Sequence, residues 1–138
     1  MMKLVIDTNV LIAALLKDSV TRELLLSPSM EFLLPEFALE EIKAHGSALS
    51  RRSGLTLEEI DLILSVLLER VSIVRASQIK PYMKRADRIV GDKDPLDAPF
   101  VALALATSND GIWSNDRHFA GIKEIKVWRT RDLLSLRS

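Results

Sequence analysis

The sequence has no cysteine among its 138 residues. This absence excludes disulfides, cysteine-ligated zinc, iron–sulfur clusters and thiol catalysis, and it is typical of an intracellular protein. A charge of one sign is also missing, because 19 Lys and Arg side chains balance 19 Asp and Glu side chains. Overall charge therefore gives no support for a nucleic-acid partner, and only a local basic face would attract one.

Long hydrophobic runs and signals for export are absent as well. No uninterrupted apolar stretch approaches the roughly 18–20 residues of a membrane span. The N-terminal Met-Met-Lys leads into an apolar run that Asp7 interrupts, which is too short and too acidic for a signal peptide. There is no Gly-x-Ser-x-Gly elbow and no glycine-rich phosphate loop, which argues against acyl-transfer and nucleotide-triphosphate chemistry. We therefore expect a cytoplasmic protein without a membrane segment.

Apolar residues make up 48% of the chain, and they form strand-like segments that alternate with helix-like segments. The length and composition predict a single domain spanning residues 1–138. Short apolar stretches predict strands at residues 4–6, 32–34, 71–74, 112–114 and 125–128. Between them, the pattern predicts helices at residues 9–17, 21–26, 36–45, 56–70, 77–90, 98–107 and 132–136, with loops at 47–54 and 91–96. Such alternation predicts an α/β protein, a three-layer α/β/α sandwich around a mainly parallel sheet.

Four acidic residues lie beside these apolar segments. Asp7 and Asp116 follow predicted strands, Glu41 lies in a predicted helix, and Asp97 lies at the start of an alanine-rich helix. Ligands of open α/β sheets bind beyond the carboxyl ends of the strands, so Asp7, Asp97 and Asp116 could converge on one edge. Carboxylates next to a core need a compensating partner, and hard oxygen ligands suit Mg²⁺ or Mn²⁺. We therefore predict a divalent metal site.

Each of these residues also has a simpler explanation. Asp7 could cap the next helix, although Thr8 or Asn9 could do so instead and leave Asp7 for the metal. Asp116 follows an asparagine, a combination that is common in turns. Ser114 and Asn115 are predicted to hydrogen-bond the other carboxylates or a water on the metal.

Helical phase separates the candidates in two of the segments. Glu41 shares a face with the apolar residues of its helix and Glu40 does not, which favours Glu41. Pro99 must lie in the first turn of its helix, which places Asp97 near the N-cap. Asp94 is then a weaker candidate, as a ligand of a second ion, and Asp92 is expected in a solvated loop. The two histidines, His45 and His118, are expected to be structural or exposed, with a phosphate contact from His118 as the alternative.

In this order and these contexts, the acidic residues resemble the signature of the PIN-domain nuclease family, in particular VapC-like toxin ribonucleases. The matching segments are Ile6-Asp7-Thr8-Asn9, Glu41-Ile42, Asp97-Ala98 and Ser114-Asn115-Asp116-Arg117-His118-Phe119. The resemblance implies an α/β/α fold and metal-dependent cleavage of single-stranded or structured RNA. It further implies a homodimer and a partner antitoxin that inhibits it.

Two groups of residues outside the acidic set are candidate contact surfaces. RNA needs cations for its phosphates, and the candidates are Arg51, Arg52, Lys80, Lys84, Arg85 and Arg88, of which 80, 84 and 88 have helical spacing. The predicted helix at 56–70 has a wider apolar stripe than one core face requires, which favours a dimer or an antitoxin contact.

A housekeeping RNA-processing nuclease and a non-catalytic RNA- or protein-binding module remain as alternatives. A phosphatase-type domain is disfavoured because Asn9 stands where a second Asp is usual.

Overall fold

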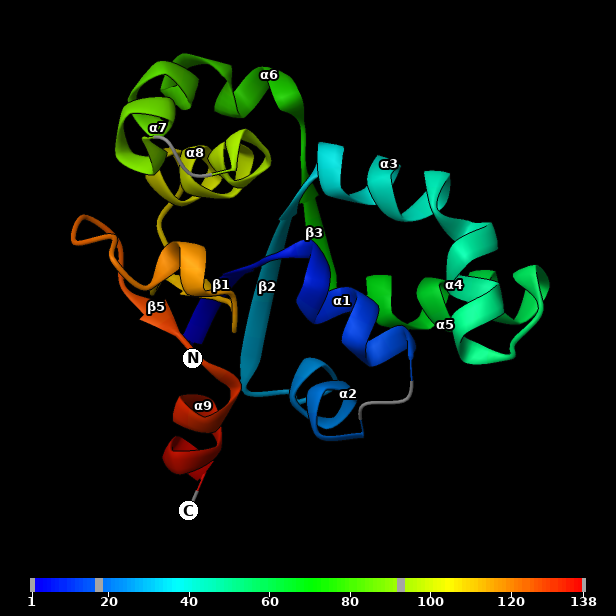
Figure 1. Cartoon of the computed structure of the whole chain (residues 1–138). Helices are drawn as coiled ribbons and strands as arrows, with labels where there is room; N and C mark the ends of the chain where they lie inside the picture. Colours follow the sequence, from blue (N-terminus) through cyan, green and yellow to red (C-terminus); the bar gives the residue numbers. More distant parts are fainter. Residues whose placement is uncertain (1, 17–18, 92–93, 138) are drawn as a thin grey trace.

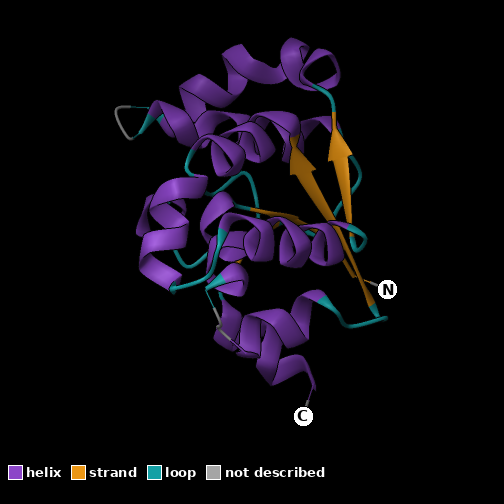
Figure 2. Ribbon diagram, turned by 90° about the vertical axis from the view of Figure 1, so that its right-hand side faces the viewer, coloured by secondary structure: helices purple, strands orange, loops and turns teal. Residues whose placement is uncertain are grey.

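The computed structural model describes residues 2–16, 19–91 and 94–137, and these form a five-stranded sheet with helices on both sides (Figure 1). The sheet order is β3-β2-β1-β4-β5, and every strand pair is parallel. The strands are β1 (Met2–Ile6), β2 (Met30–Pro35), β3 (Val71–Val74), β4 (Ile112–Trp113) and β5 (Val127–Trp128). Figure 2 shows neighbouring strands side by side with their arrowheads pointing the same way. The predicted α/β/α sandwich and its parallel sheet are confirmed.

Two groups of helices cover the two faces of the sheet. The first group is α1 (Thr8–Leu15), α2 (Ser19–Leu25), α3 (Glu36–Ala44), α4 (Gly46–Ser53) and α5 (Leu57–Leu68). The second group is α6 (Ala76–Ile79), η1 (Lys80–Tyr82), α7 (Met83–Val90), η2 (Pro95–Asp97) and α8 (Ala98–Ala106). Figure 1 shows these groups on opposite sides of β2, and α8 contacts β1, β2 and β4 directly. The remaining elements are η3 (Arg117–Phe119) and α9 (Thr130–Arg137). None of the described helices has the length and apolar character that a membrane crossing requires.

The strand order determines where a site can form. The chain moves outward from β1 through β2 to β3, then returns across the other face of the sheet to β4, beside β1. In parallel sheets a crevice opens beyond the carboxyl ends of the two strands where the order reverses. Here those strands are β1 and β4, which are followed by Asp7 and by the segment Ser114–Asp116.

The core lies along the central strands. Leu4, Val5 and Ile6 of β1 are fully buried, because β1 has strands on both edges and helices on both faces. A strand covered in this way reads as a continuous apolar run, which is why the sequence predicted it well. Phe32 and Trp113 are also buried, and their ring centroids lie 5.7 Å apart at an interplanar angle of 43°.

Gly111 allows β4 and β5 to approach each other. Its φ is +127°, a conformation that favours glycine, and a Cβ built there would lie 2.2 Å from the carbonyl oxygen of Lys126. The Gly111 carbonyl also accepts a hydrogen bond from the Val5 N–H at 2.9 Å. The residue therefore joins β1, β4 and β5 just before the strand that leads to the site.

One predicted loop is a helix. Residues 47–54 were expected to be irregular, whereas residues 46–53 form α4, which ends at Gly54 with a φ of +74°. Gly46 therefore begins α4 and does not cap α3, whose C-cap is His45. The reason is tertiary packing: Leu49 is buried against the core and anchors a segment whose other residues are mostly polar. A single apolar anchor is too weak a pattern to predict a helix.

One predicted helix is interrupted. The segment 77–90 divides into α6, η1 and α7, with Pro81 in the 3-10 turn between the two α-helices. Proline cannot donate the backbone hydrogen bond that a continuous helix needs, so the α-helix is interrupted there.

By contrast, the helix predicted from Thr56 is confirmed as α5. Glu59 N–H donates to Thr56 Oγ1, and Thr56 N–H donates to Glu59 Oε1, both at 3.1 Å. The predicted helix end at Lys17 lies outside the described residues.

Candidate active site

Asp7 lies at the end of β1, and its side chain is almost completely buried, with 4% exposure for the residue. Its Oδ1 accepts a hydrogen bond from the Val10 N–H at 2.9 Å, and its Oδ2 accepts one from the Ser114 hydroxyl. The expectation that Thr8 or Asn9 would cap α1 is therefore wrong, because Asp7 is itself the N-cap. Asp7 can be both a helix cap and a metal ligand, because Oδ1 caps α1 while Oδ2 lies toward the end of β4.

The environment of Asp7 disfavours its charged form. Burial raises the pKa of Asp7 from its ordinary value of 3.8 to about 6, and the carboxylates of Asp116 and Asp97 raise it as well. Hydrogen bonds from Ser114 and Val10 act in the opposite direction but do not outweigh burial. A cation nearby would stabilise the charged form of a carboxylate that is buried beside two others.

Ser114 connects the ends of β1 and β4. The residue is buried, its hydroxyl donates to Asp7 Oδ2, and its oxygen accepts from the Asp116 N–H at 3.0 Å. Ser114 therefore makes the predicted hydrogen bond to another carboxylate. Asn115 does not support the carboxylates in this way. Its Nδ2 donates to Thr130 Oγ1 at 2.9 Å and its Oδ1 accepts from Thr130 N–H at 3.0 Å, which fixes the start of α9.

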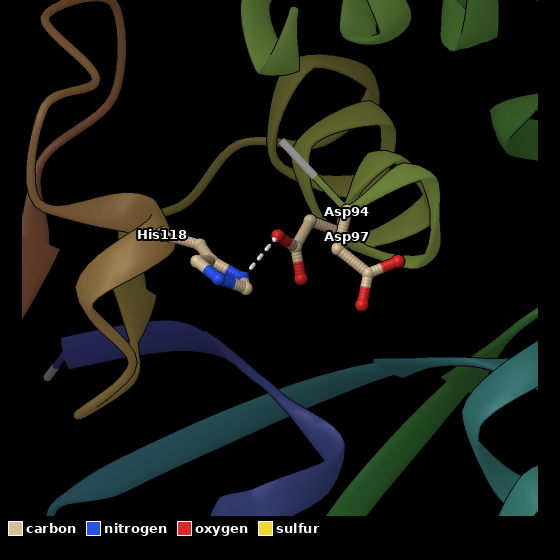
Figure 3. A group of neighbouring side chains, drawn as sticks. All are labelled: Asp94, Asp97 and His118. Carbon is tan, nitrogen blue, oxygen red and sulfur yellow. Dashed lines mark hydrogen bonds and ion pairs between the residues drawn. The ribbon is translucent and has the colours of Figure 1, made fainter. Parts of the chain in front are cut away.

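Asp97 lies at the N-cap position of α8, as predicted, but its side chain makes no capping hydrogen bond. Its Oδ2 instead lies 3.1 Å from Nδ1 of His118 (Figure 3). Burial raises the pKa of Asp97, and the carboxylates of Asp116 and Asp94 add to this, while His118 lowers it. Asp94 is exposed and caps η2 through Oδ1, which accepts from Leu96 N–H at 2.9 Å.

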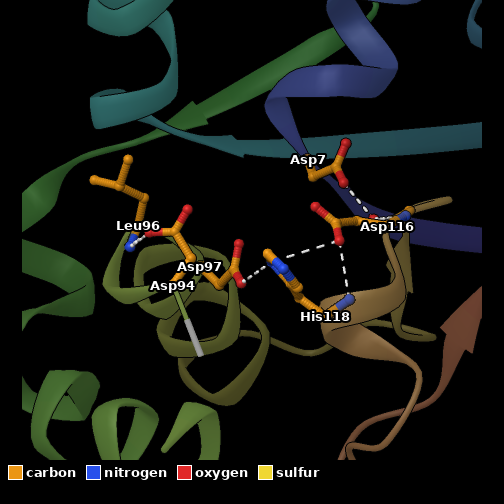
Figure 4. Close-up of polar contacts among 7 residues, drawn as sticks. Asp7, Asp94, Leu96, Asp97, Asp116 and His118 are labelled. Atoms are coloured by element: carbon orange, nitrogen blue, oxygen red, sulfur yellow. Dashed lines mark hydrogen bonds and ion pairs between the residues drawn. The ribbon is translucent and has the colours of Figure 1, made fainter. Parts of the chain in front are cut away.

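Asp116 begins η3 and faces the same space (Figure 4). Its Oδ1 accepts from the backbone N–H of His118 at 2.9 Å and lies 3.5 Å from Nδ1 of that residue. The turn interpretation of Asp116 is thus also true, yet the carboxylate remains 27% exposed toward the crevice. Like Asp7, Asp116 both caps a local element and lies in the shared pocket.

Glu41 lies on α3 and is bonded to the start of α1. The Thr8 hydroxyl donates to Glu41 Oε1 at 3.1 Å, which ties α3 to the start of α1. Glu41 is half-buried whereas Glu40 is exposed, as the helical phase predicted. Thr8 therefore supports Glu41 and does not cap its own helix.

The structure brings all five predicted carboxylates into one pocket at the β1–β4 switch point. The pocket is lined by Asp7, Thr8, Asn9, Ile12, Glu41, His45, Asp94, Leu96, Asp97, Phe100, Asp116 and Phe119. Within residues 2–16, 19–91 and 94–137, no lysine or arginine pairs with Asp7, Asp97 or Asp116. Several oxygen donors that face one another without a balancing cation fit a divalent ion such as Mg²⁺ or Mn²⁺. The metal-binding and catalytic roles of these residues remain predictions.

Sequence reasoning missed the place of both histidines. Both histidines are exposed, as expected, but His118 also lies between Asp97 and Asp116, and His45 lines the pocket. A signal existed for His118, because it follows Asp116 by two residues in a turn that the Asp itself caps. His45, at the end of α3, had no such signal. Asp92 lies outside the described residues.

The basic residues proposed for RNA lie apart from the carboxylates. None of the predicted basic side chains lines the acidic pocket in the described part of the chain. The spacing of Lys80, Lys84 and Arg88 does not form a stripe on one helix, because Lys80 belongs to η1 and the others to α7. Arg51 and Arg52 are exposed in the last turn of α4. The single helix expected to carry these residues is therefore divided, and their contact roles are untested.

Comparison with known proteins agrees with this geometry. A family model described as PIN domain matches residues 5–137. The chain belongs to the PIN domain family, which classes the protein as a nuclease. No curated protein matches it at a significant level.

Among solved structures, the chain resembles one in the crystal structure of VapBC2 from Rickettsia felis bound to a DNA fragment from their promoter. The TM-score is 0.65 at 18% identity, and the match covers 93% of this chain and 98% of that chain. At this identity the likeness shows a shared fold.

Proposed function

We propose that the protein is a metal-dependent endoribonuclease that hydrolyses phosphodiester bonds of single-stranded or structured RNA. The observation that carries this proposal is the buried Asp7, whose pKa is raised to about 6 and which faces Asp97 and Asp116. A protein that kept the fold only for binding would have no need for several mutually repelling carboxylates in one pocket.

The carboxylates of Asp7, Glu41, Asp97 and Asp116 would hold one or two Mg²⁺ or Mn²⁺ ions, with Asp94 as a ligand of second rank. When bound, such an ion activates water as a nucleophile and offsets negative charge on the phosphate. The donor set consists of hard oxygens, which suits both ions.

The chain's own contribution is to hold these carboxylates in fixed orientations. Ser114 donates to Asp7 Oδ2 and accepts from the backbone N–H of Asp116 through one hydroxyl, which links the ends of β1 and β4. Thr8 fixes Glu41 in the same way from α1. Groups that orient metal ligands typically change metal affinity or activity about 10- to 100-fold when removed. We therefore assign Ser114 and Thr8 as positioning residues.

Basic residues outside the pocket would bind the phosphates of the RNA backbone. The proposed contacts are Arg51, Arg52, Lys80, Lys84, Arg85 and Arg88, all of which are exposed. Each phosphate contact that is lost should weaken RNA binding and reduce its salt dependence by roughly one unit of the log–log slope. Reversing the charge of one residue at a time and measuring RNA affinity against salt concentration tests this assignment.

The proposed activity is tested with end-labelled RNA and matched variants. Purified protein in Mn²⁺ is expected to cleave single-stranded RNA, and Asp116→Asn and Glu41→Gln are expected to reduce the rate by two orders of magnitude or more. Asp87→Asn, an exposed aspartate of α7 outside the pocket, is the control and should cleave normally. Single-stranded DNA and duplex RNA of the same sequence establish the substrate class. RNA binding without cleavage at any divalent ion would instead support a non-catalytic binding module.

We also propose that the protein is the toxin of a toxin–antitoxin pair. The solved structure that it resembles is titled as a VapBC2 complex on promoter DNA. A short open reading frame for a small DNA-binding protein next to this gene, whose product suppresses the RNase activity on co-purification, is the expected result. Undiminished activity in the presence of every neighbouring gene product would favour a housekeeping processing nuclease.

The exposed face of α5 supports a homodimer. Leu62 and Val66, four residues apart on one face of the helix, are 68% and 48% exposed, and adjacent exposed apolar side chains often mark an interface. Light scattering of the wild type should give a dimer, and Leu62→Glu should give a monomer. A wild-type monomer at high concentration would contradict this proposal.

A further inference from the structure

His118 has no role in the function proposed above, yet it lies in the middle of the acidic pocket. Its Nδ1 is 3.1 Å from Asp97 Oδ2 and 3.5 Å from Asp116 Oδ1, while the side chain is 48% exposed. The ring therefore lies close to two carboxylates and remains accessible to an ion from solvent.

The position of His118 is built into the fold. Its backbone N–H donates to Asp116 Oδ1 at 2.9 Å, and the next residue, Phe119, is buried in the core. On the opposite side, Asp94 is oriented by the bond from Leu96 N–H to its Oδ1. The imidazole and the two carboxylates thus come from turns that are fixed independently, one after β4 and one before α8.

These three side chains have the spacing of a metal site. One ligand atom from each of Asp94, Asp97 and His118 lies within 4.8 Å of the others (Figure 3). Around one octahedral ion with bonds of about 2.1 Å, ligand atoms lie roughly 3 to 4.2 Å apart. Small rotations of the exposed Asp94 and His118 side chains would close the remaining difference.

We propose that Asp94, Asp97 and His118 form a mixed carboxylate–imidazole site for a second divalent cation, which selects Mn²⁺ or a later first-row transition ion over Mg²⁺. The inference rests on the proposed function in one respect, since Asp97 is shared with the carboxylate site. The selectivity follows from the donor atoms. Mg²⁺ prefers oxygen and water, whereas imidazole nitrogen suits transition ions, whose affinities rise along the first row.

A purely structural role for His118 makes a different prediction. If the imidazole only donates a hydrogen bond to Asp97, then asparagine, whose amide lies near the position of Nδ1, should replace it with little effect. If the ring nitrogen is a ligand, asparagine should fail. His118→Asn therefore separates the two roles, and His45→Gln is the matched control because His45 also lines the pocket.

The test uses Mn²⁺ and the full chain without RNA, at a pH above the usual range of histidine titration. Pulsed electron paramagnetic resonance of bound Mn²⁺ should show nitrogen coupling in the wild type and His45→Gln, and none in His118→Asn. Calorimetry should show Mn²⁺ binding at this site weakened about tenfold or more in His118→Asn and in Asp94→Asn. Mg²⁺ binding to His118→Asn should be nearly unchanged.

Absence of nitrogen coupling in the wild type would overturn the proposal, as would coupling that persists in His118→Asn. Equal Mn²⁺ affinity of the wild type and His118→Asn would also overturn it. These readouts are independent of the RNase assay. A protein that cleaves no RNA but shows His118-dependent coupling would refute the proposed activity and leave the metal site standing.

Discussion

Replacement of Asp7 by asparagine should stabilise the metal-free protein at neutral pH. The carboxyl pKa is about 6 in the folded state against an ordinary value of 3.8. Each pKa unit corresponds to about 1.4 kcal/mol, so the ionised Asp7 destabilises the fold by up to about 3 kcal/mol. An amide removes this cost, can still accept the bond from Val10 N–H through its oxygen, and can present its NH₂ to the Ser114 oxygen.

The sign of the pH dependence follows from the raised pKa. Below pH 3.8 Asp7 is protonated in both the folded and unfolded states, and the penalty is absent. Between pH 3.8 and 6 the unfolded chain ionises first, so the penalty grows, and above pH 6 it is complete. The pKa of Asp97 is also raised, but it contributes in the same direction to the wild type and to the variant. The difference between the two proteins therefore reports the burial of Asp7 together with its repulsion of Asp97 and Asp116.

Urea unfolding in EDTA between pH 4 and pH 8 measures this difference. The variant should match the wild type near pH 4 and exceed its free energy of unfolding by up to about 3 kcal/mol above pH 6. Asp87→Asn, which is exposed, should follow the wild type throughout. Added Mn²⁺ should stabilise the wild type more than Asp7→Asn, because ligand binding stabilises only the fold that binds it and the variant lacks one carboxylate ligand. A variant that is no more stable than the wild type at pH 7.5 in EDTA would refute the reasoning.

Three further substitutions test individual contacts. Ser114→Ala should cost about 1–3 kcal/mol in urea unfolding and raise the pKa of Asp7 further, which would shift the acidic limb of the pH–rate profile upward. Gly111→Ala should lower the melting temperature far more than Gly54→Ala, since both have positive φ but only at Gly111 does a Cβ meet backbone. Thr56→Ala should cost about 1 kcal/mol through loss of the capping box, without changing RNA cleavage.

The site could be predicted from sequence because its residues lie next to strong local patterns. Asp7 follows a continuous apolar strand, and Glu41 lies in phase with the apolar face of its helix. The positions of these residues need only strand ends and helical periodicity. The position of His118 needs the tertiary distance to Asp97, which is 21 residues away in sequence. Asn115 likewise hydrogen-bonds Thr130, which is 15 residues later in the chain, so its role also depends on tertiary contacts.

The fold shows the same division between local and tertiary causes. The capping box at Thr56 and the buried run of β1 are local signals, and both gave the right elements. Helix α4 depends on Leu49 packing into the core, and its polar composition concealed it. One continuous helix was expected over residues 77–90, whereas Pro81 lies in the 3-10 turn between α6 and α7, both of which pack on α8.

The most direct test of the account compares wild type and Asp7→Asn on one single-stranded RNA, each in Mn²⁺ and in EDTA. We predict mapped internal cleavage by the wild type in Mn²⁺, and none by the wild type in EDTA or by Asp7→Asn in either condition. Cleavage by a correctly folded Asp7→Asn at the wild-type rate, or by the wild type in EDTA, would contradict the claim that these carboxylates form a metal-dependent nuclease site.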